Sequence, residues 1–303
     1  MVEEHKVAIA GATGYVGGRL ARRLVARGTS VRVLGRHRQK LAPFLALGAE
    51  AGVADMADHA ATRAALRDVT CAYYLVHAMG AAGDFAARDR HYATVFRTAA
   101  AEAGVQRIIY LGGLGEHADH LSAHLASRRE VAQILQEGVV PVTVLRAGVI
   151  VGGGSASFRM IRDLVRHLPL MICPRWVRTQ CQPIAIDDAL GYLAACLQEP
   201  RTRGAQFDMG GPDVLSYQAM LETFARLSHR PQVIVPVPVL TPRLSSYWIG
   251  LVTAVPASLA RPLIEGVRSP AVCQDHRIRT LLPQPLQSYE EAVRRILHST
   301  GNA

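Results

Sequence analysis

The chain has 303 residues, of which 50% are hydrophobic and 19% are charged. This composition supports a sizeable buried core and excludes a disordered chain, and the length corresponds to roughly two domains of ~150 residues. The formal net charge of +10 is typical of nucleic-acid binding, but all except two of the 34 basic residues are arginines dispersed along the chain. Because no basic run is interleaved with aromatic residues, we expect no nucleic-acid partner.

Cysteine usage and the N-terminus bear on the cellular compartment. The five cysteines are far apart and never form C-x-x-C, which argues against a zinc ribbon or a disulfide framework. No apolar segment of the signal-peptide kind follows Met1, and no stretch reaches the ~18 apolar residues of a spanning helix. We therefore expect a cytoplasmic protein without a membrane span.

Strands and helices alternate regularly through the first half of the chain. Continuous apolar runs predict strands at 7–10, 31–34, 51–53, 71–76, 107–111 and 142–145. Amphipathic stretches predict helices at 15–27, 37–47, 59–67, 85–103 and 121–136. Apolar strands separated by helical stretches indicate right-handed crossovers and a parallel sheet covered on both faces. The predicted fold class is α/β, with a Rossmann-type doubly wound parallel sheet.

The alternation loosens after residue 151. The pattern predicts a helix at 155–167, an irregular segment at 169–183, a helix at 187–197 and a strand at 206–209 that returns to the sheet. We expect a first domain at 1–152 with a return segment at about 183–210, and a smaller C-terminal lobe formed by 153–182 and 211–303. The apolar stretch 247–255 lacks a lysine-rich face, so we expect it to line a cleft or an oligomer contact, such as a homodimer interface.

A glycine motif precedes the first predicted helix and directly follows the first strand. It reads G-x-x-G-x-x-G. The residues of the motif expected to bind a cofactor are Gly11, Thr13, Gly14, Tyr15, Val16 and Gly17. The glycines permit a tight turn, close approach of a pyrophosphate to the backbone and close packing of the helix, whose N-terminus attracts phosphate. In this strand–turn–helix context the motif predicts a dinucleotide site in residues 1–152.

The end of the second strand distinguishes between the two dinucleotides. A carboxylate there would bind the 2′-hydroxyl of NAD, whereas this chain has Arg36 and no acid. Arginine complements a 2′-phosphate in charge and geometry, so we expect NADP(H); the alternative is a solvated residue at the helix entry. Further cofactor contacts are expected after the third and fourth strands, from Asp55, Met56, Val76, His77 and Ala78.

These segments resemble the short-chain dehydrogenase/reductase superfamily, in particular its atypical, NmrA-like members. The resemblance covers about residues 6 to 230. It is carried by the glycine motif, Asp55-Met56, the segment 103–110, Leu145-Arg146-Ala147-Gly148 and Ile186-Asp187-Asp188-Ala189. It implies a Rossmann domain that binds NAD(P)H, with the substrate over the nicotinamide and a small C-terminal substrate lobe.

The catalytic pair of that superfamily, Y-x-x-x-K, is absent. No tyrosine has a lysine four residues on, and Gly112-Gly113 occupies the position of the family's serine. In the expected place stand His124 and Arg128, whose spacing of four puts them on one helix face. An imidazolium with a pKa near its reference of ~6.5 could donate a proton, and Arg128 could hold the ribose. The alternative is a surface histidine in a protein that binds the cofactor without this chemistry.

Two other chemistries find less support. His117, His120 and His124 have spacings that suit metal ligands, but no cysteine or carboxylate completes the set, so we expect no metal site. A Ser-His-Asp hydrolase is not indicated because G-x-S-x-G is missing.

The favoured interpretation is an NADP(H)-dependent reductase that acts on a small or medium apolar carbonyl or enone. Arg175, Arg178 and Gln182 could recognise an oxygenated or acidic substituent, or could form no more than a solvated loop. Two alternatives stay open. One is a redox sensor or assembly protein that binds NADP(H) without turnover, and the other is a non-redox lyase, isomerase or cyclase on the same scaffold.

Overall fold

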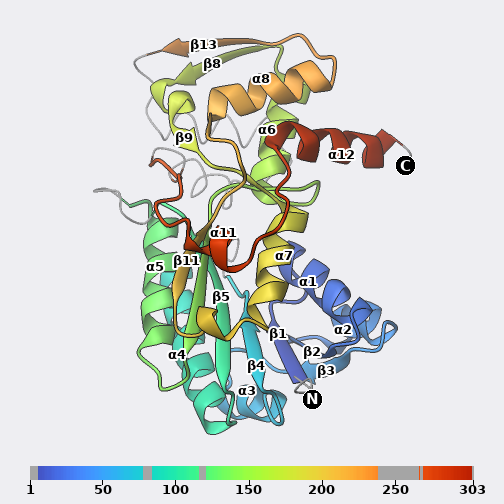
Figure 1. Cartoon of the computed structure of the whole chain (residues 1–303), viewed down its shortest axis with the longest axis vertical. Helices are drawn as coiled ribbons and strands as arrows, with labels where there is room; N and C mark the ends of the chain where they lie inside the picture. Colours follow the sequence, from blue (N-terminus) through green and yellow to red (C-terminus); the bar gives the residue numbers. More distant parts are fainter. Residues whose placement is uncertain (1–5, 78–83, 116–120, 238–265, 267–268, 302–303) are drawn as a thin grey trace.

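The computed structural model describes residues 6–77, 84–115, 121–237, 266 and 269–301 (Figure 1). Its main feature is a seven-stranded sheet of order β11-β6-β5-β4-β1-β2-β3, in which every pair of neighbours is parallel. The strands are β1 (Lys6–Ala10), β2 (Ser30–Gly35), β3 (Glu50–Val53), β4 (Cys71–Tyr74), β5 (Arg107–Gly113), β6 (Val142–Ala147) and β11 (Gln206–Met209). This sheet confirms the predicted fold class.

Helices cover both faces of the sheet, as Figure 1 shows. Side chains of α1, α2 and α7 pack in one apolar cluster, and those of α4 and α5 pack in another, to which α3 contributes. The helices are α1 (Tyr15–Ala26), α2 (Arg38–Leu45), α3 (His59–Ala65), α4 (Phe85–Glu102), α5 (Ala123–Gln136) and α7 (Ile186–Cys196), with a short 3₁₀ helix η2 (Pro200–Thr202) before β11.

The alternation of side chains along β1 explains the two-sided core. Val7 and Ile9 belong to the cluster that contains α1, whereas Ala8 and Ala10 belong to the cluster that contains α4. All four side chains are at most 1% exposed. A strand buried on both faces is apolar at every position, which is why the sequence shows a continuous run instead of alternation.

Most of the other described elements form a lobe at the carboxyl ends of the strands, at the top of Figure 1. Its core is a separate apolar cluster in which Phe158 of α6 meets Phe224 of α8 edge to face at 5.7 Å. The elements are β7 (Ile150–Val151), α6 (Ala156–His167), β8 (Leu170–Pro174), η1 (Arg175–Arg178), β9 (Gln180–Cys181), β10 (Ile184–Ala185), β12 (Leu215–Ser216), α8 (Tyr217–Leu227), β13 (Val233–Val237) and α12 (Tyr289–Gly301). Helix α11 (Arg277–Leu281) packs instead beside β11, where Ile278 belongs to the cluster that contains α1 and α7. The apolar stretch 247–255 lies outside the described residues.

One segment differs from the sequence prediction. Residues 169–183 were expected to be irregular, but β8 pairs in parallel with β13, and η1 and β9 follow it. The partner strand lies some 60 residues further along the chain, so no local sequence pattern predicts the pairing. Met171 is buried while its neighbours Leu170 and Ile172 are 55% and 58% exposed, which gives the alternation of a strand with one open face.

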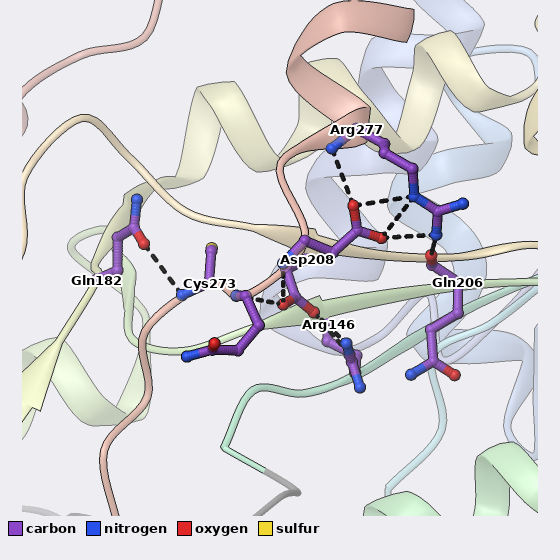
Figure 2. A network of polar contacts seen from close by, with 8 residues as sticks. Arg146, Gln182, Gln206, Asp208, Cys273 and Arg277 are labelled. Atoms are coloured by element: carbon purple, nitrogen blue, oxygen red, sulfur yellow. Dashed lines mark hydrogen bonds and ion pairs between the residues drawn. The ribbon is translucent and has the colours of Figure 1, made fainter.

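A buried polar network joins the C-terminal segment to the sheet (Figure 2). Asp208 on β11 is paired with Arg146 on β6 at 2.6 Å, and both residues are at most 6% exposed. The second carboxylate oxygen of Asp208 accepts the backbone N–H groups of Gln274 and Asp275. These bonds fasten the chain after residue 272 against the edge strand of the sheet.

Candidate functional site

A cleft of about 370 Å³ opens at the carboxyl ends of β1, β2 and β4. In the sheet, β1 lies between β2 and β4, so the cleft is at the topological switch point where doubly wound folds bind ligands. Eight of the twelve residues predicted to contact the cofactor line it. The full lining is Gly11, Thr13, Gly14, Leu34, Gly35, Arg36, Ala54, Asp55, Met56, Leu75, Val76, His77, Arg88 and Tyr92.

The glycine turn is shaped by close backbone contacts. Gly11 has φ of +92°, and a Cβ there would lie 2.5 Å from the carbonyl oxygen of Leu75. A Cβ on Gly17 would lie 2.3 Å from the carbonyl oxygen of Gly11, so α1 could not begin so close to the turn with any other residue. Gly14 caps α1 without a side-chain hydrogen bond, and the first turn carries no acid. These features fit a dinucleotide, since the helix N-terminus faces the cleft without a competing anion.

The remaining motif residues lie in the first turn of α1. Val16 and Gly17 are not part of the cleft lining, and neither is Tyr15. The Tyr15 ring lies against the loop after β7, where a Cβ on Gly154 would come within 2.5 Å of the ring. Tyr15 therefore fixes the lobe's first loop to the nucleotide domain, a contact that the motif itself does not reveal.

Arg36, Asp55 and Met56 form the end of the cleft at β2 and β3. Arg36 is exposed and makes no ion pair with any described residue, so its guanidinium is available to an anion. Asp55 accepts the backbone N–H of Ala57 at 3.0 Å, which holds its carboxylate at the turn after β3. Met56 is 7% exposed and packs into the core beside the cleft.

At the other end of the cleft, His77 belongs to a polar chain that joins the loop after β4 to α4 and α5. Its Nδ1 lies 2.8 Å from a carboxylate oxygen of Asp89 on α4, and its Nε2 lies 3.1 Å from Nδ1 of His124 on α5. Ser127 donates a hydrogen bond to the same carboxylate oxygen at 3.0 Å. Asp89 and Ser127 are each 2% exposed.

Burial sets the protonation of both histidines. It lowers the pKa of His77 to about 4, aided by the Arg128 guanidinium and opposed by Asp89. Burial also lowers the pKa of His124 well below its usual value, and the neighbouring Arg128 and His77 act in the same direction. Both imidazoles are therefore neutral near pH 7. This differs from the near-reference pKa expected for His124, because burial, and then Arg128 and His77, disfavour its cation.

Arg128 and its helix are fixed to the end of β5. The Arg128 guanidinium donates to the carbonyl oxygen of Leu111 at 2.8 Å, and the Tyr110 hydroxyl donates to the carbonyl oxygen of Arg128 at 3.1 Å. A Cβ on Gly113 would lie 2.8 Å from a methyl carbon of Leu125. The glycine at the end of β5 thus lets α5 approach the sheet closely.

Sequence reasoning missed three residues of α4. Arg88 and Tyr92 line the cleft, and Asp89 supports His77. The spacing of four between Arg88 and Tyr92 puts them on one face of a helix that follows the fourth strand. That spacing was a usable signal, whereas nothing in the sequence distinguishes Asp89 from an ordinary helix-surface acid.

The residues expected at the substrate are not gathered at the cleft. Gln182 is 3% exposed, and its amide donates to the carbonyl of Gly211 and accepts from the backbone N–H of Cys273 (Figure 2). This is a structural position between two loops. Arg178 is exposed in η1. The Arg175 side chain and Ala78 lie outside the described residues.

Within the part of the chain that the structure describes, no three His, Cys, Asp or Glu side chains are grouped so as to hold a metal ion. His117 and His120 lie outside that part. No described helix is both long and apolar enough to cross a membrane.

The sheet order and the glycine turn define a Rossmann-type dinucleotide-binding protein. The model of a family described as NAD(P)H-binding matches residues 11–164, about half of the chain. The chain therefore belongs to this NAD(P)H-binding family, which confirms the family and the NAD(P)H cofactor expected from the motif. No significant match was found among curated proteins.

Solved structures share the fold over nearly the whole chain at low sequence identity. A nucleoside-diphosphate-sugar epimerase from Staphylococcus aureus is 13% identical with a TM-score of 0.79, covering 95% of this chain and 99% of its own. The triphenylmethane reductase of Citrobacter sp., complexed with NADP(H), is 15% identical with a TM-score of 0.78, covering 96% and 99%. An NADPH-dependent quinone oxidoreductase from Escherichia coli, complexed with NADPH, is 18% identical with a TM-score of 0.77, covering 96% and 99%.

Proposed function

We propose that the protein is an NADP(H)-dependent reductase of an apolar carbonyl or enone that works without the Y-x-x-x-K pair. One observation carries the proposal. The same cleft joins a glycine turn at a helix N-terminus, the exposed Arg36 and the part-buried His77, which is bonded in turn to His124. A dinucleotide site that contains groups able to exchange a proton is suited to hydride-transfer chemistry, in which the bound cofactor supplies the hydride.

The cofactor would lie along the cleft in a defined direction. Backbone N–H groups between Gly11 and Gly17 would hold the pyrophosphate. Arg36 would bind the 2′-phosphate, because its exposed guanidinium complements a phosphate dianion in charge and geometry. Asp55 and Met56 would contact the adenine end, and Val76 and His77 the nicotinamide end.

The substrate class rests on the relatives. Two structures of the same fold are named for reductions by a nicotinamide cofactor, one of triphenylmethane compounds and one of quinones. A quinone is a doubly conjugated enone, so we propose quinones as the first acceptors to test.

Proton exchange would fall to His124, and Arg128 would hold the ribose side of the site. His124 contacts His77, which lines the cleft, and Arg128 lowers the pKa of both imidazoles. Arg178 and Gln182 are weaker candidates for the substrate, because the first is exposed in η1 and the second is committed to backbone groups.

The test is steady-state oxidation of NADPH with a series of quinones, enones and aliphatic ketones. We expect turnover with the conjugated acceptors. Gly14→Val is the matched control, because a branched side chain would stand where the pyrophosphate approaches the backbone. The variant should keep its circular dichroism spectrum and lose NADPH binding.

A second function is favoured by one observation. Two neutral histidines and no tyrosine–lysine pair leave little resting acid at pH 7. Tight NADPH binding without turnover of any acceptor would therefore replace the reductase with a redox sensor or assembly protein that binds the cofactor.

A further inference from the structure

The polar chain at the end of β4 has a direction. A carboxylate oxygen only accepts hydrogen bonds, so the contact with Asp89 requires the proton of neutral His77 to be on Nδ1. The Nε2 of His77 is then an acceptor, and its contact with His124 requires the proton of His124 to be on Nδ1. The remaining ring nitrogen, Nε2 of His124, carries a lone pair and bonds no described residue.

We propose that Asp89, His77 and His124 form a proton relay whose open end, Nε2 of His124, accepts a hydrogen bond from a substrate hydroxyl. The inference rests on the proposed function and deepens it. In its resting state the site recognises the reduced, hydroxyl form of the substrate together with the oxidised cofactor. His77 and Asp89 are positioning residues, because they act through His124.

The relay balances protons and electrons in both directions. When a secondary alcohol is oxidised, its hydroxyl proton would go to Nε2 of His124 and its C–O bond would become C=O. Bound NADP⁺ would supply the acceptor for the hydride from the carbinol carbon. The Nδ1 proton of His124 then moves to Nε2 of His77. The positive charge ends on His77, 2.8 Å from the Asp89 carboxylate, and reduction of the carbonyl reverses these steps.

The surroundings favour the unprotonated relay. The charged groups that act on the two imidazoles are Arg128 from α5, which disfavours a cation, and Asp89 from α4, which stabilises one on His77. Burial also disfavours the cation at both sites. Oxidation of the hydroxyl form should therefore be fast at neutral and alkaline pH, and reduction should accelerate as the pH falls.

The first measurement is independent of activity. Nitrogen-15 NMR of histidine-labelled protein distinguishes the Nδ1–H from the Nε2–H tautomer, and His77→Gln and His124→Gln assign the two signals. We expect Nδ1–H for both residues at pH 7.5 in the protein without cofactor. An Nε2–H tautomer at His124 would overturn the relay.

The second measurement uses Asp89→Asn, which removes the carboxylate that fixes the tautomer and stabilises the charge. We expect kcat for alcohol oxidation to fall at least about 10²-fold at pH 7.5, with the Kd of NADPH within twofold of the native value. His91→Gln, an exposed histidine two residues further along α4, is the matched control and should behave as native. A pH profile of kcat in Asp89→Asn that matches the native profile would contradict the relay.

The two measurements separate failure of the relay from failure of the reductase. Both Nδ1–H tautomers without turnover of any substrate would leave the relay in place and remove the reductase. Turnover with an Nε2–H tautomer at His124 would support the reductase and overturn the relay.

Discussion

Two buried aspartates, Asp89 and Asp208, have different surroundings. Each is 2% exposed and accepts several hydrogen bonds. The partners of Asp208 are the guanidinium of Arg146 and two backbone N–H groups, none of which changes its protonation near neutral pH. The partners of Asp89 include an imidazole, which can change it.

The partners of a buried carboxylate determine its role. At Asp208 the charges are permanent and the network fastens a distant segment to an edge strand (Figure 2). At Asp89 the network includes His77, which lines the cleft, and ends at His124; both imidazoles can take or give a proton. The first arrangement stabilises the fold and the second is the one that we propose for chemistry, although the acid and its exposure are the same.

The largest expected effect tests the structural half of this comparison. Asp208→Ala removes the partner of a buried guanidinium and the acceptor of two backbone N–H groups. We expect a loss of about 3–5 kcal/mol in the free energy of unfolding, measured by urea titration. Asp208→Asn should lose less, because it keeps an acceptor oxygen. The exposed pair of Arg226 and Glu290 is the control, and Glu290→Gln should leave the midpoint unchanged.

The pH dependence of stability sharpens the other half. The pKa of His77 is about 4 in the fold against an ordinary 6.5, so between these values the unfolded chain binds a proton that the folded chain does not. The stability that this proton difference contributes is fully present above pH 6.5 and is lost as the pH falls toward 4. At about 1.4 kcal/mol per unit the loss is on the order of 3 kcal/mol, and His124 adds to it.

The comparison with His77→Gln checks this assignment. The variant cannot be protonated at this position, so its urea midpoint should vary less between pH 4.5 and 7 than that of the native protein. An equally steep acid limb in the variant would show that other groups cause the loss.

A smaller effect concerns the opposite end of the cleft. Arg36 is an exposed cation, and its bonds to a 2′-phosphate are worth ~1.5–3 kcal/mol. Arg36→Asp should weaken NADPH binding by roughly 10- to 100-fold and leave NADH binding unchanged or stronger, measured by calorimetry. Tighter binding of NADH than of NADPH by the native protein would remove the assignment of NADP(H).

The smallest expected effect belongs to Gln182. Its amide binds backbone groups and does not face the cleft, so Gln182→Leu should lower stability by about 1–3 kcal/mol through two lost partners. The KM for the acceptor should stay within twofold. A change confined to KM would show that Gln182 contacts the substrate.

Local chemistry made the main sheet and the glycine turn predictable. The seven strands of the main sheet were each predicted within a few residues, because strands buried on both faces are continuous apolar runs. The glycine turn was predictable because its contacts lie within a few residues of Gly11 or reach Leu75, which follows the neighbouring strand β4. Segment 169–183 was not, since β8 depends on a partner in β13.

The sequence by itself determined the parallel α/β sheet, the glycine turn with the basic Arg36, and the absence of a tyrosine–lysine pair. Only the tertiary structure decided what His77, Asp89 and His124 do together. Asp89 and His124 lie 12 and 47 positions after His77, and the three residues come from α4, α5 and the loop after β4. Their tautomers and lowered pKa values arise from mutual contact and shared burial, which exist once α4 and α5 pack against the sheet.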